Sequence, residues 1–195
     1  MSIQENIKRV VEVEARAISS LVEQIDESFE RAFTLLMNCK GKVIVTGVGK
    51  SGHIGKKIAA TFASTGTPSF FVHSTEGLHG DLGMIEQNDV VVMLSNSGET
   101  EEVCRLFPTI REIGAKIIAI TSGENSRMAK LSDAVIIYRY NSEADHLGVA
   151  PTTSSTVTLV IGDALAVALS QAKNFQREDF HLFHPGGSLG QKLSQ

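Results

Sequence analysis

The residues best suited to chemistry lie in the serine loop (residues 95–100), Ser95-Asn96-Ser97-Gly98-Glu99-Thr100, which directly follows an apolar run. Its three hydroxyls surround a glycine, and a glycine lets the backbone fold closely around an anion. The segment also fits an ordinary helix start, with Ser97 as the N-cap and acids in the first turn. That alternative leaves Ser95 and Thr100 without a purpose. We therefore predict a phosphate site formed by Ser95, Asn96, Ser97 and Thr100.

A second candidate is the glycine loop (residues 47–52), Gly47-Val48-Gly49-Lys50-Ser51-Gly52, which matches the dinucleotide fingerprint and ends in a Gly-Lys-Ser similar to a P-loop. A P-loop needs a further glycine where this chain has Ile44. A dinucleotide site needs an acid after the next strand, where the chain has His73. We therefore expect no cofactor. We interpret Lys50 as a point charge for an anionic substrate, with Gly49 and Ser51 beside it, rather than as an ordinary surface lysine.

Both loops need a scaffold of alternating strands and helices. Apolar runs predict strands at residues 42–46, 69–72, 90–94, 116–120 and 134–137. Helical spacing and flanking loops predict helices at residues 53–63, 99–113 and 153–173. Because the strands are continuously apolar, the fold class is α/β, with a mostly parallel five-stranded sheet in a three-layer, doubly wound sandwich. Ligands bind at the carboxyl ends of such strands, where both loops fall.

The N-terminal segment has a pattern of its own. Apolar residues recur at helical spacing over residues 7–37 without Pro or Gly, which predicts one long amphipathic helix that can bend. Such a helix either covers the sheet or forms an interface with another subunit. We find no linker or repeat, so we expect one domain over residues 1–195, with the helix in 1–37 and the sheet, its helices and a C-terminal tail in 38–195.

Composition limits the classes of partner. A net charge of −4 supplies no broad positive field, so we expect neither nucleic acid nor a membrane surface as a partner. The two cysteines, Cys39 and Cys104, form neither a disulfide framework nor a thiolate metal site. The first 14 residues lack the apolar core of a signal peptide, and we see no apolar run of about 18 residues, so we expect a soluble cytoplasmic protein.

Metal chemistry has weak support. Five side chains could be assembled into a metal site on paper, but none shows a ligand spacing such as His-x-x-x-His; they are His53, His73, His79, Asp81 and His146. We therefore expect no metal in the reaction.

Six segments together resemble the sugar isomerase (SIS) domain of arabinose-5-phosphate isomerases: residues 47–55, 79–84, 95–100, 150–154, 162–166 and 183–190. The resemblance runs from about residue 37 to residue 193. It implies a flavodoxin-like sheet and interconversion of D-arabinose 5-phosphate and D-ribulose 5-phosphate through an enediol, in the synthesis of Kdo for lipopolysaccharide. The serine loop alone would indicate only the SIS superfamily, which includes non-catalytic phosphosugar sensors. A sensor, or an isomerase of another phosphosugar, therefore stays as an alternative.

The resemblance also implies roles for particular residues. The catalytic positions match Lys50, Glu102, Glu143 and His184, with His79 as a further candidate. Enediol chemistry needs a base, a group that stabilises the oxyanion and a hold on the phosphate, which these residue types supply. SIS proteins commonly combine residues from two subunits, so we expect a homo-oligomer, with a tetramer favoured, and sites at subunit interfaces.

The chain departs from the family pattern in two places. Longer members continue into CBS modules, whereas this chain stops at Gln195, so we expect no regulation through such modules. The family often has His-Pro where this chain has His73-Ser74, and Glu-x-Cys-Pro where it has Glu143-Ala144-Asp145-His146. Both changes flank the site, so they concern the choice of substrate more than the class of reaction.

Overall fold

The computed structural model describes residues 2–185 of the chain. Its strands form one parallel sheet in the order β2-β1-β3-β4-β5. Their bounds are β1 (Val43–Gly47), β2 (Ser69–His73), β3 (Val90–Leu94), β4 (Lys116–Thr121) and β5 (Ala134–Ile137). The prediction of a five-stranded parallel α/β sheet is confirmed.

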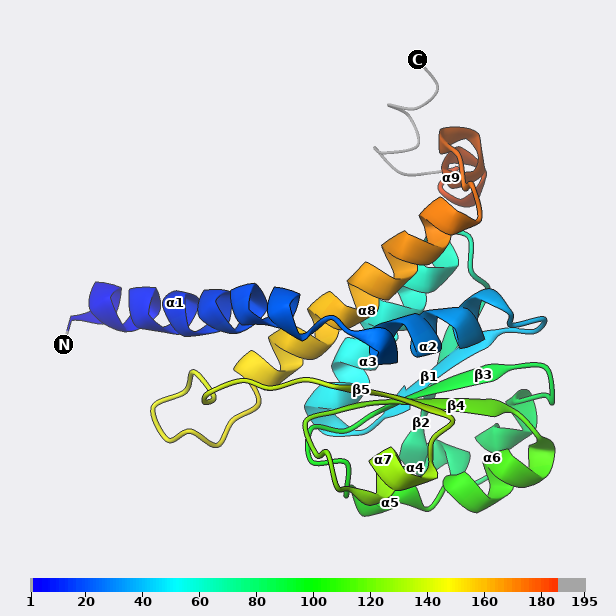
Figure 1. Ribbon diagram of the computed structural model, residues 1–195, viewed down its shortest axis with the longest axis horizontal. Helices are drawn as coiled ribbons and strands as arrows, with labels where there is room; N and C mark the ends of the chain where they lie inside the picture. The colour runs from blue at the N-terminus through cyan, green and yellow to red at the C-terminus, as the bar shows by residue number, and fades with distance from the viewer. Residues whose placement is uncertain (1, 186–195) are drawn as a thin grey trace.

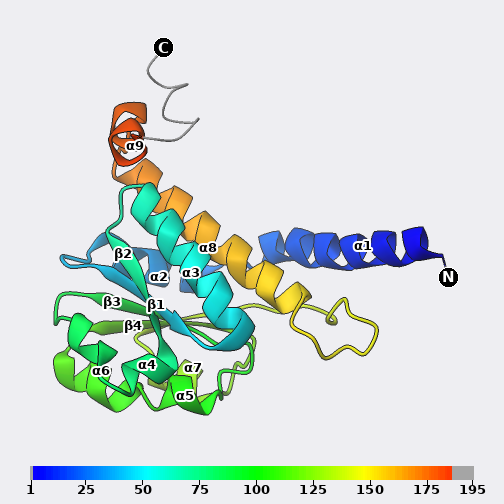
Figure 2. The same cartoon turned by 180° about the vertical axis from the view of Figure 1, so that it is seen from behind.

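Helices cover both faces of the sheet (Figures 1 and 2). One layer contains α2 (Glu27–Met37), α3 (Gly49–Ser64) and α8 (Thr153–Ala172). The other contains α4 (Ser74–Gly77), the short 3-10 helix η2 (Asp81–Met84), α5 (Glu101–Cys104), α6 (Phe107–Ile113) and α7 (Arg127–Leu131). Successive residues of a strand point to opposite faces, so Val43 and Val45 pack in the first layer and Ile44 in the second.

The prediction of a long N-terminal helix is confirmed, but that helix does not continue to residue 37. The segment forms α1 (Ile3–Leu21), a 3-10 turn η1 (Val22–Gln24) and then α2. The helix ends because Ile25 is extended and Asp26 caps α2, its carboxylate accepting a 2.8 Å hydrogen bond from the Ser28 N–H. As Figure 1 shows, α2 lies on the sheet, whereas α1 projects beyond it. Of this segment, α2 is therefore the part that covers the sheet.

Two helix boundaries near the predicted site also differ from the predictions. The predicted helix over residues 99–113 is divided into α5 and α6, with Pro108 in the first turn of α6, where its missing N–H costs no helical hydrogen bond. The helix predicted from residue 53 begins earlier, at Gly49, because that glycine adopts a positive φ of 56° that turns the chain into α3. Residues 49–52 of the glycine loop thus form the first turn of α3, whereas Gly47 ends β1.

The expectation that no apolar stretch is long enough for a membrane span does not hold for α8. Among the described residues, α8 has the length and the mean hydropathy, 1.4, of a membrane span. Half of that stretch is buried inside the protein, and α8 packs along α3, where Lys57 and Asp163 form an ion pair of 2.5 Å. Its composition is that of a helix in the protein core.

After α8 the chain forms α9 (Arg177–Phe183), which stands at the far end of α8 from Thr153 (Figure 2). Its exposed side chains include Leu182 and Phe183, which are 71% and 52% exposed. The C-terminal tail predicted to carry a Pro-Gly-Gly motif lies, from residue 186 onward, outside the described residues.

Candidate active site

Both candidate loops lie at the point where the strand order reverses. From β1 the chain moves to β2 on one side, and from β3 it moves to β4 and β5 on the other. The glycine loop follows β1 and the serine loop follows β3. Their strands pack so closely that a Cβ on Gly47 would lie 3.1 Å from the Leu94 carbonyl oxygen. Open α/β sheets bind ligands in the crevice at such a reversal, so the sheet brings the two loops to one candidate site.

The serine loop is organised by its own hydroxyl groups. Ser95 is buried, and its Oγ shares a 2.7 Å hydrogen bond with Thr100 Oγ1 and accepts another from the Gly98 N–H at 3.1 Å. Ser97 is exposed, and its Oγ accepts from the Glu99 N–H. Gly98 has a positive φ of 68°, which favours glycine. The residue that precedes α5 is Thr100 rather than Ser97, so the simple N-cap alternative does not describe this loop.

Arg127, which sequence reasoning missed, holds the serine loop from α7. Its Nε donates to Glu99 Oε2 at 2.7 Å, its Nη2 donates to the Glu99 carbonyl at 2.9 Å, and its Nη1 lies 2.9 Å from Glu101 Oε2. The side-chain and backbone hydrogen bonds from Arg127 lower the pKa of Glu99. No local pattern indicates this contact, because 28 residues separate the two positions.

The Asn96 side chain is engaged within the protein. Its Nδ2 donates to the Tyr140 hydroxyl at 2.9 Å, and its Oδ1 accepts from the Tyr138 hydroxyl and from Ser122 Oγ, both at 3.0 Å. Asn96 was predicted to bind phosphate; in the structure its amide supports the serine loop through these contacts. Neither tyrosine was predicted as a site residue. The sequence near the end of an apolar strand does not distinguish a tyrosine whose hydroxyl hydrogen-bonds to a loop from one whose ring only packs.

Glu143 is anchored at the start of α8. Its Oε2 accepts hydrogen bonds from the Thr152 N–H (2.8 Å), the Thr152 hydroxyl (3.1 Å) and the Ser154 N–H (3.2 Å), and its Oε1 accepts from the Tyr140 hydroxyl at 3.1 Å. Partial burial by itself raises the pKa of Glu143, but the hydrogen bonds from Ser154, Thr152 and Tyr140 outweigh it, so the pKa lies below the ordinary value. Glu143 is therefore an ionised carboxylate with a fixed orientation.

Lys50 and Glu102 have the opposite character. Lys50 is the second residue of α3 and Glu102 the second of α5, and both are exposed. Within residues 2–185 neither side chain has a hydrogen bond or an ion pair to another residue. Both side chains are therefore free to meet a ligand, and Ser51 lies next to Lys50 in the first turn of α3.

The two candidate histidines lie in different places. His79 is exposed and follows α4, which begins at the carboxyl end of β2, the edge that carries the two loops. His184 follows α9, and its ring stacks on Phe180 with centroids 3.9 Å apart. Glu143 marks the start of α8, whose 20 residues span roughly 30 Å before the chain reaches α9. Within one chain, His184 is therefore not brought to the crevice.

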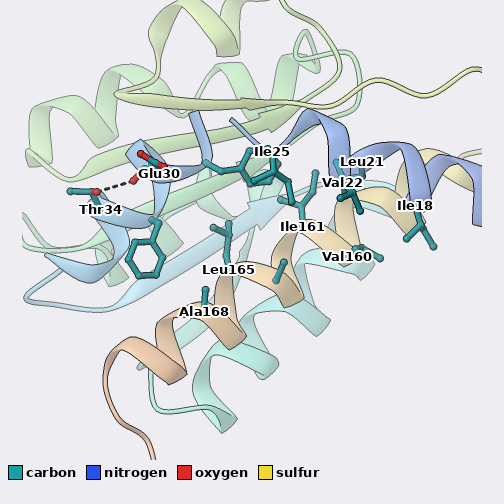
Figure 3. Close-up of a pocket in the computed structure, with 13 residues that line it drawn as sticks. Ile18, Leu21, Val22, Ile25, Glu30, Thr34, Val160, Ile161, Leu165 and Ala168 are labelled. Carbon is teal, nitrogen blue, oxygen red and sulfur yellow. Dashed lines mark hydrogen bonds between the residues drawn. The ribbon is translucent and has the colours of Figure 1, made fainter. Parts of the chain in front are cut away.

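A large apolar groove lies away from these residues. Figure 3 shows it between the end of α1, α2 and α8, with a volume of about 610 Å³. Its lining includes Leu21, Ile25, Phe33 and Leu165, and none of the predicted site residues. Elsewhere in the described chain, no group of three or more His, Cys, Asp or Glu side chains is placed to hold a metal ion.

Comparison with known proteins agrees with this geometry. The SIS domain family matches residues 35–168. The arabinose 5-phosphate isomerase KdsD of Escherichia coli K12 is 52% identical over 186 residues, which are 95% of this chain and 57% of KdsD. KpsF of Escherichia coli O6:H1, an arabinose 5-phosphate isomerase, is 48% identical over 189 residues, 96% of this chain and 58% of KpsF. The chain thus spans well under two thirds of these relatives.

Solved structures also resemble this chain, in one case over the full length of the other protein. The c3406 protein of Escherichia coli CFT073, in complex with arabinose 5-phosphate, superposes with a TM-score of 0.91 at 47% identity, covering 95% of this chain and 100% of that one. The Vibrio vulnificus NanR protein, complexed with ManNAc-6P, has a TM-score of 0.79 at 17% identity over 92% of this chain and 67% of that one, which shows a shared fold. From its sheet, its two crevice loops and these matches, the chain belongs to the SIS domain family, and its curated relatives are arabinose 5-phosphate isomerases.

Proposed function

We propose that this protein interconverts D-arabinose 5-phosphate and D-ribulose 5-phosphate through an enediol, in the synthesis of Kdo. The observation that carries the proposal is the similarity to c3406, which was solved with arabinose 5-phosphate. The match has 47% identity and covers the full length of the c3406 chain. The free Lys50 and Glu102 side chains at the crevice agree with it, because a sensor that only binds a phosphosugar needs no free carboxylate beside its ligand.

The serine loop binds the phosphate in this proposal. Its hydroxyls and N–H groups surround the anion, and Lys50 adds a positive charge from the first turn of α3. The reaction then moves a proton between C1 and C2 of the sugar, which needs a carboxylate that can gain and release that proton.

The two glutamates have different roles in this proposal. Glu143 accepts four hydrogen bonds, so it takes up a proton less readily than a free carboxylate does. We assign proton transfer to Glu102, and we assign to Glu143 the orientation of the sugar hydroxyls by an ionised oxygen. His79 lies at the same edge of the sheet, where it can stabilise the oxyanion or open the ring.

His184 completes the site of a neighbouring subunit in this proposal. It lies too far from the crevice of its own chain, while exposed apolar residues on α1 and α9 offer surfaces for other copies; they include Ile3, Ile7, Val11, Leu182 and Phe183. The apolar groove between α1, α2 and α8 is a further contact surface (Figure 3). We infer a homotetramer with sites at subunit interfaces, acting in the cytoplasm on a small sugar phosphate and without nucleic acid or membrane partners.

The activity is tested by incubating the pure protein with D-ribulose 5-phosphate and a panel of phosphosugars, with products identified by NMR. D-Arabinose 5-phosphate is expected. Glu102→Gln should reduce turnover by at least about a hundredfold, the scale of a lost general base. Glu112→Gln is the matched control, because Glu112 is an exposed acid of α6, whose C-terminus leads into the start of β4 at the opposite edge of the sheet. Binding without any product would contradict the isomerase and favour a sensor.

The shared site is tested by mixing subunits. Glu102→Gln and His184→Ala proteins are each expected to be nearly inactive. After dissociation and reassembly together, random mixing gives about a quarter of sites with both native residues if the two come from different chains. A mixture as inactive as its components would show that His184 does not complete a neighbour's site.

A further inference from the structure

Tyr140 links the two parts of the site that the chain order keeps apart. It lies just after β5, and its hydroxyl both accepts from the Asn96 amide at 2.9 Å and donates to Glu143 Oε1 at 3.1 Å. Asn96 belongs to the serine loop, and Glu143 precedes α8. One hydroxyl therefore joins the loop that binds the phosphate to a carboxylate of the reaction.

The direction of these hydrogen bonds is determined by the groups around Asn96. Its Oδ1 already accepts from the hydroxyls of Tyr138 and Ser122, so its other end, Nδ2, must face Tyr140. The Tyr140 oxygen accepts there, which leaves its own proton for Glu143. Partial burial and the nearby charge of Glu143 raise the pKa of Tyr140, so the hydroxyl keeps that proton at ordinary pH.

The packing around Tyr140 holds its ring in place. The ring stacks on that of Tyr138, with centroids 6.1 Å apart and planes inclined by 29°. Tyr138 is buried, and its own hydroxyl accepts from Thr158 of α8 at 3.2 Å. Since both rings are restrained, the Tyr140 hydroxyl meets Glu143 without a large loss of side-chain freedom.

We propose that Tyr140 is a positioning residue of this enzyme, whose hydroxyl fixes Glu143 Oε1 in register with the serine loop. The proposal rests on the proposed function for its catalytic meaning. Without the Tyr140 hydroxyl, Glu143 keeps its three contacts at Oε2 but can rotate its other oxygen away from the sugar.

Other charged groups near Glu143 do not replace this contact. Arg9 of α1 donates to the Ala144 carbonyl at 2.9 Å, and Arg139 pairs with Glu124 at 3.1 Å. Asp145 accepts from backbone N–H groups of its own loop, where His146 follows it. Ser154 is the other neighbour, because its side chain bonds to Glu143 and to Tyr140 and lowers the pKa of both groups. The hydrogen bond to Glu143 Oε1 comes from Tyr140.

The first test measures the ionisation of Glu143 directly. The full-length protein is labelled with ¹³C at the glutamate carboxyls, and the Glu143 signal is assigned as the one that Glu143→Gln removes. Tyr140→Phe deletes only the hydroxyl and is expected to raise the pKa of Glu143 by about one pH unit, the scale of one hydrogen bond to a charged group. Tyr138→Phe is the matched control, because it removes a buried hydroxyl from the same cluster without touching Glu143, and it should leave that titration in place.

The second test asks whether Tyr140 acts through Glu143. Tyr140→Phe should lower kcat/KM about tenfold in the native protein, but by less than about twofold when Glu143 is already Gln, since two residues that act through one contact are not additive. Equal losses in both backgrounds, or an unchanged Glu143 titration, would overturn the positioning role. A native protein without turnover would instead overturn the proposed isomerase and leave the titration result standing, so the two failures are distinguishable.

Discussion

Replacing Gly98 by alanine should damage the serine loop more than its backbone conformation alone explains. Gly98 has a φ of 68°, and holding an alanine there costs about 1 kcal/mol. A Cβ at this position would also collide with Ser126 Oγ and would lie 2.8 Å from Thr121 Oγ1. Two separate costs therefore fall on one methyl group.

The collision has a cost that follows from the role of Ser126. This serine is the N-cap of α7, and its hydroxyl accepts from the Ala129 N–H at 3.2 Å. Rotating its hydroxyl away from an added methyl group loses a cap worth about 1 kcal/mol. The added Cβ would still lie 2.6 Å from Ser126 Cβ, so the backbone must also shift. The total destabilisation of Gly98→Ala is thus about 2–3 kcal/mol, which lowers the Tm of a domain of this size by roughly 5–10 °C.

Gly148→Ala provides the matched control. Gly148 has nearly the same φ, 67°, but an added Cβ there would meet nothing within 4 Å. It should cost about 1 kcal/mol, from backbone strain alone. Both variants are measured by urea and thermal unfolding at one protein concentration, since assembly makes stability depend on concentration. Equal losses for the two variants would refute the argument that Ser126 blocks a side chain at residue 98.

Three further predictions concern stability. Because hydrogen bonds lower the pKa of Glu143 below the ordinary 4.5, its ionised form stabilises the fold above that pH. Glu143→Gln should therefore be less stable than the native protein at pH 7, and the difference should shrink as the pH falls below about 4.5. Urea unfolding that shows the same difference at pH 7 and pH 3 would contradict this. Gly162→Ala should cost about 1–3 kcal/mol, because its Cβ would lie 2.5 Å from two atoms of Ile58, and adding Ile58→Ala should cost less in that background than alone. Asp89→Ala should cost roughly 2–4 kcal/mol of stability, because the buried carboxylate accepts hydrogen bonds from two backbone N–H groups at 2.7 and 2.8 Å. An equal loss in Asp89→Asn, which keeps one acceptor, would argue against that cause.

The features that depend on local sequence were predicted well. Strand positions follow from continuous apolar runs, and the β3 run at 90–94 has the same bounds in the structure as in the prediction. The two crevice loops could be found because glycine, hydroxyl and lysine side chains stand directly after strands, and the carboxyl ends of parallel strands meet at one edge. Even here one boundary was missed, since the start of α3 depends on the conformation of Gly49.

The local signals near the helix breaks pointed the wrong way. An unbroken helical pattern over residues 7–37 indicates one helix, yet the turn η1 and two extended residues, Ile25 and Asp26, separate α1 from α2. Burial decided this, because α2 can reach the sheet only if the chain turns there. Hydrophobic periodicity shows which face of a helix is apolar. It does not change at a break after which the second helix continues the same apolar spacing.

The sequence by itself determined the class of the fold and the position of the two loops directly after β1 and β3, and it predicts a phosphate site there. The tertiary structure alone decided how those side chains are held: Arg127 grips Glu99, Asn96 turns its amide to Tyr140, and Glu143 is fixed at the start of α8. It also decided that His184 lies at the far end of α8 from the crevice. The physical reason is distance along the chain, because hydrogen bonds between residues dozens of positions apart depend on packing of the whole domain and leave no periodic signal.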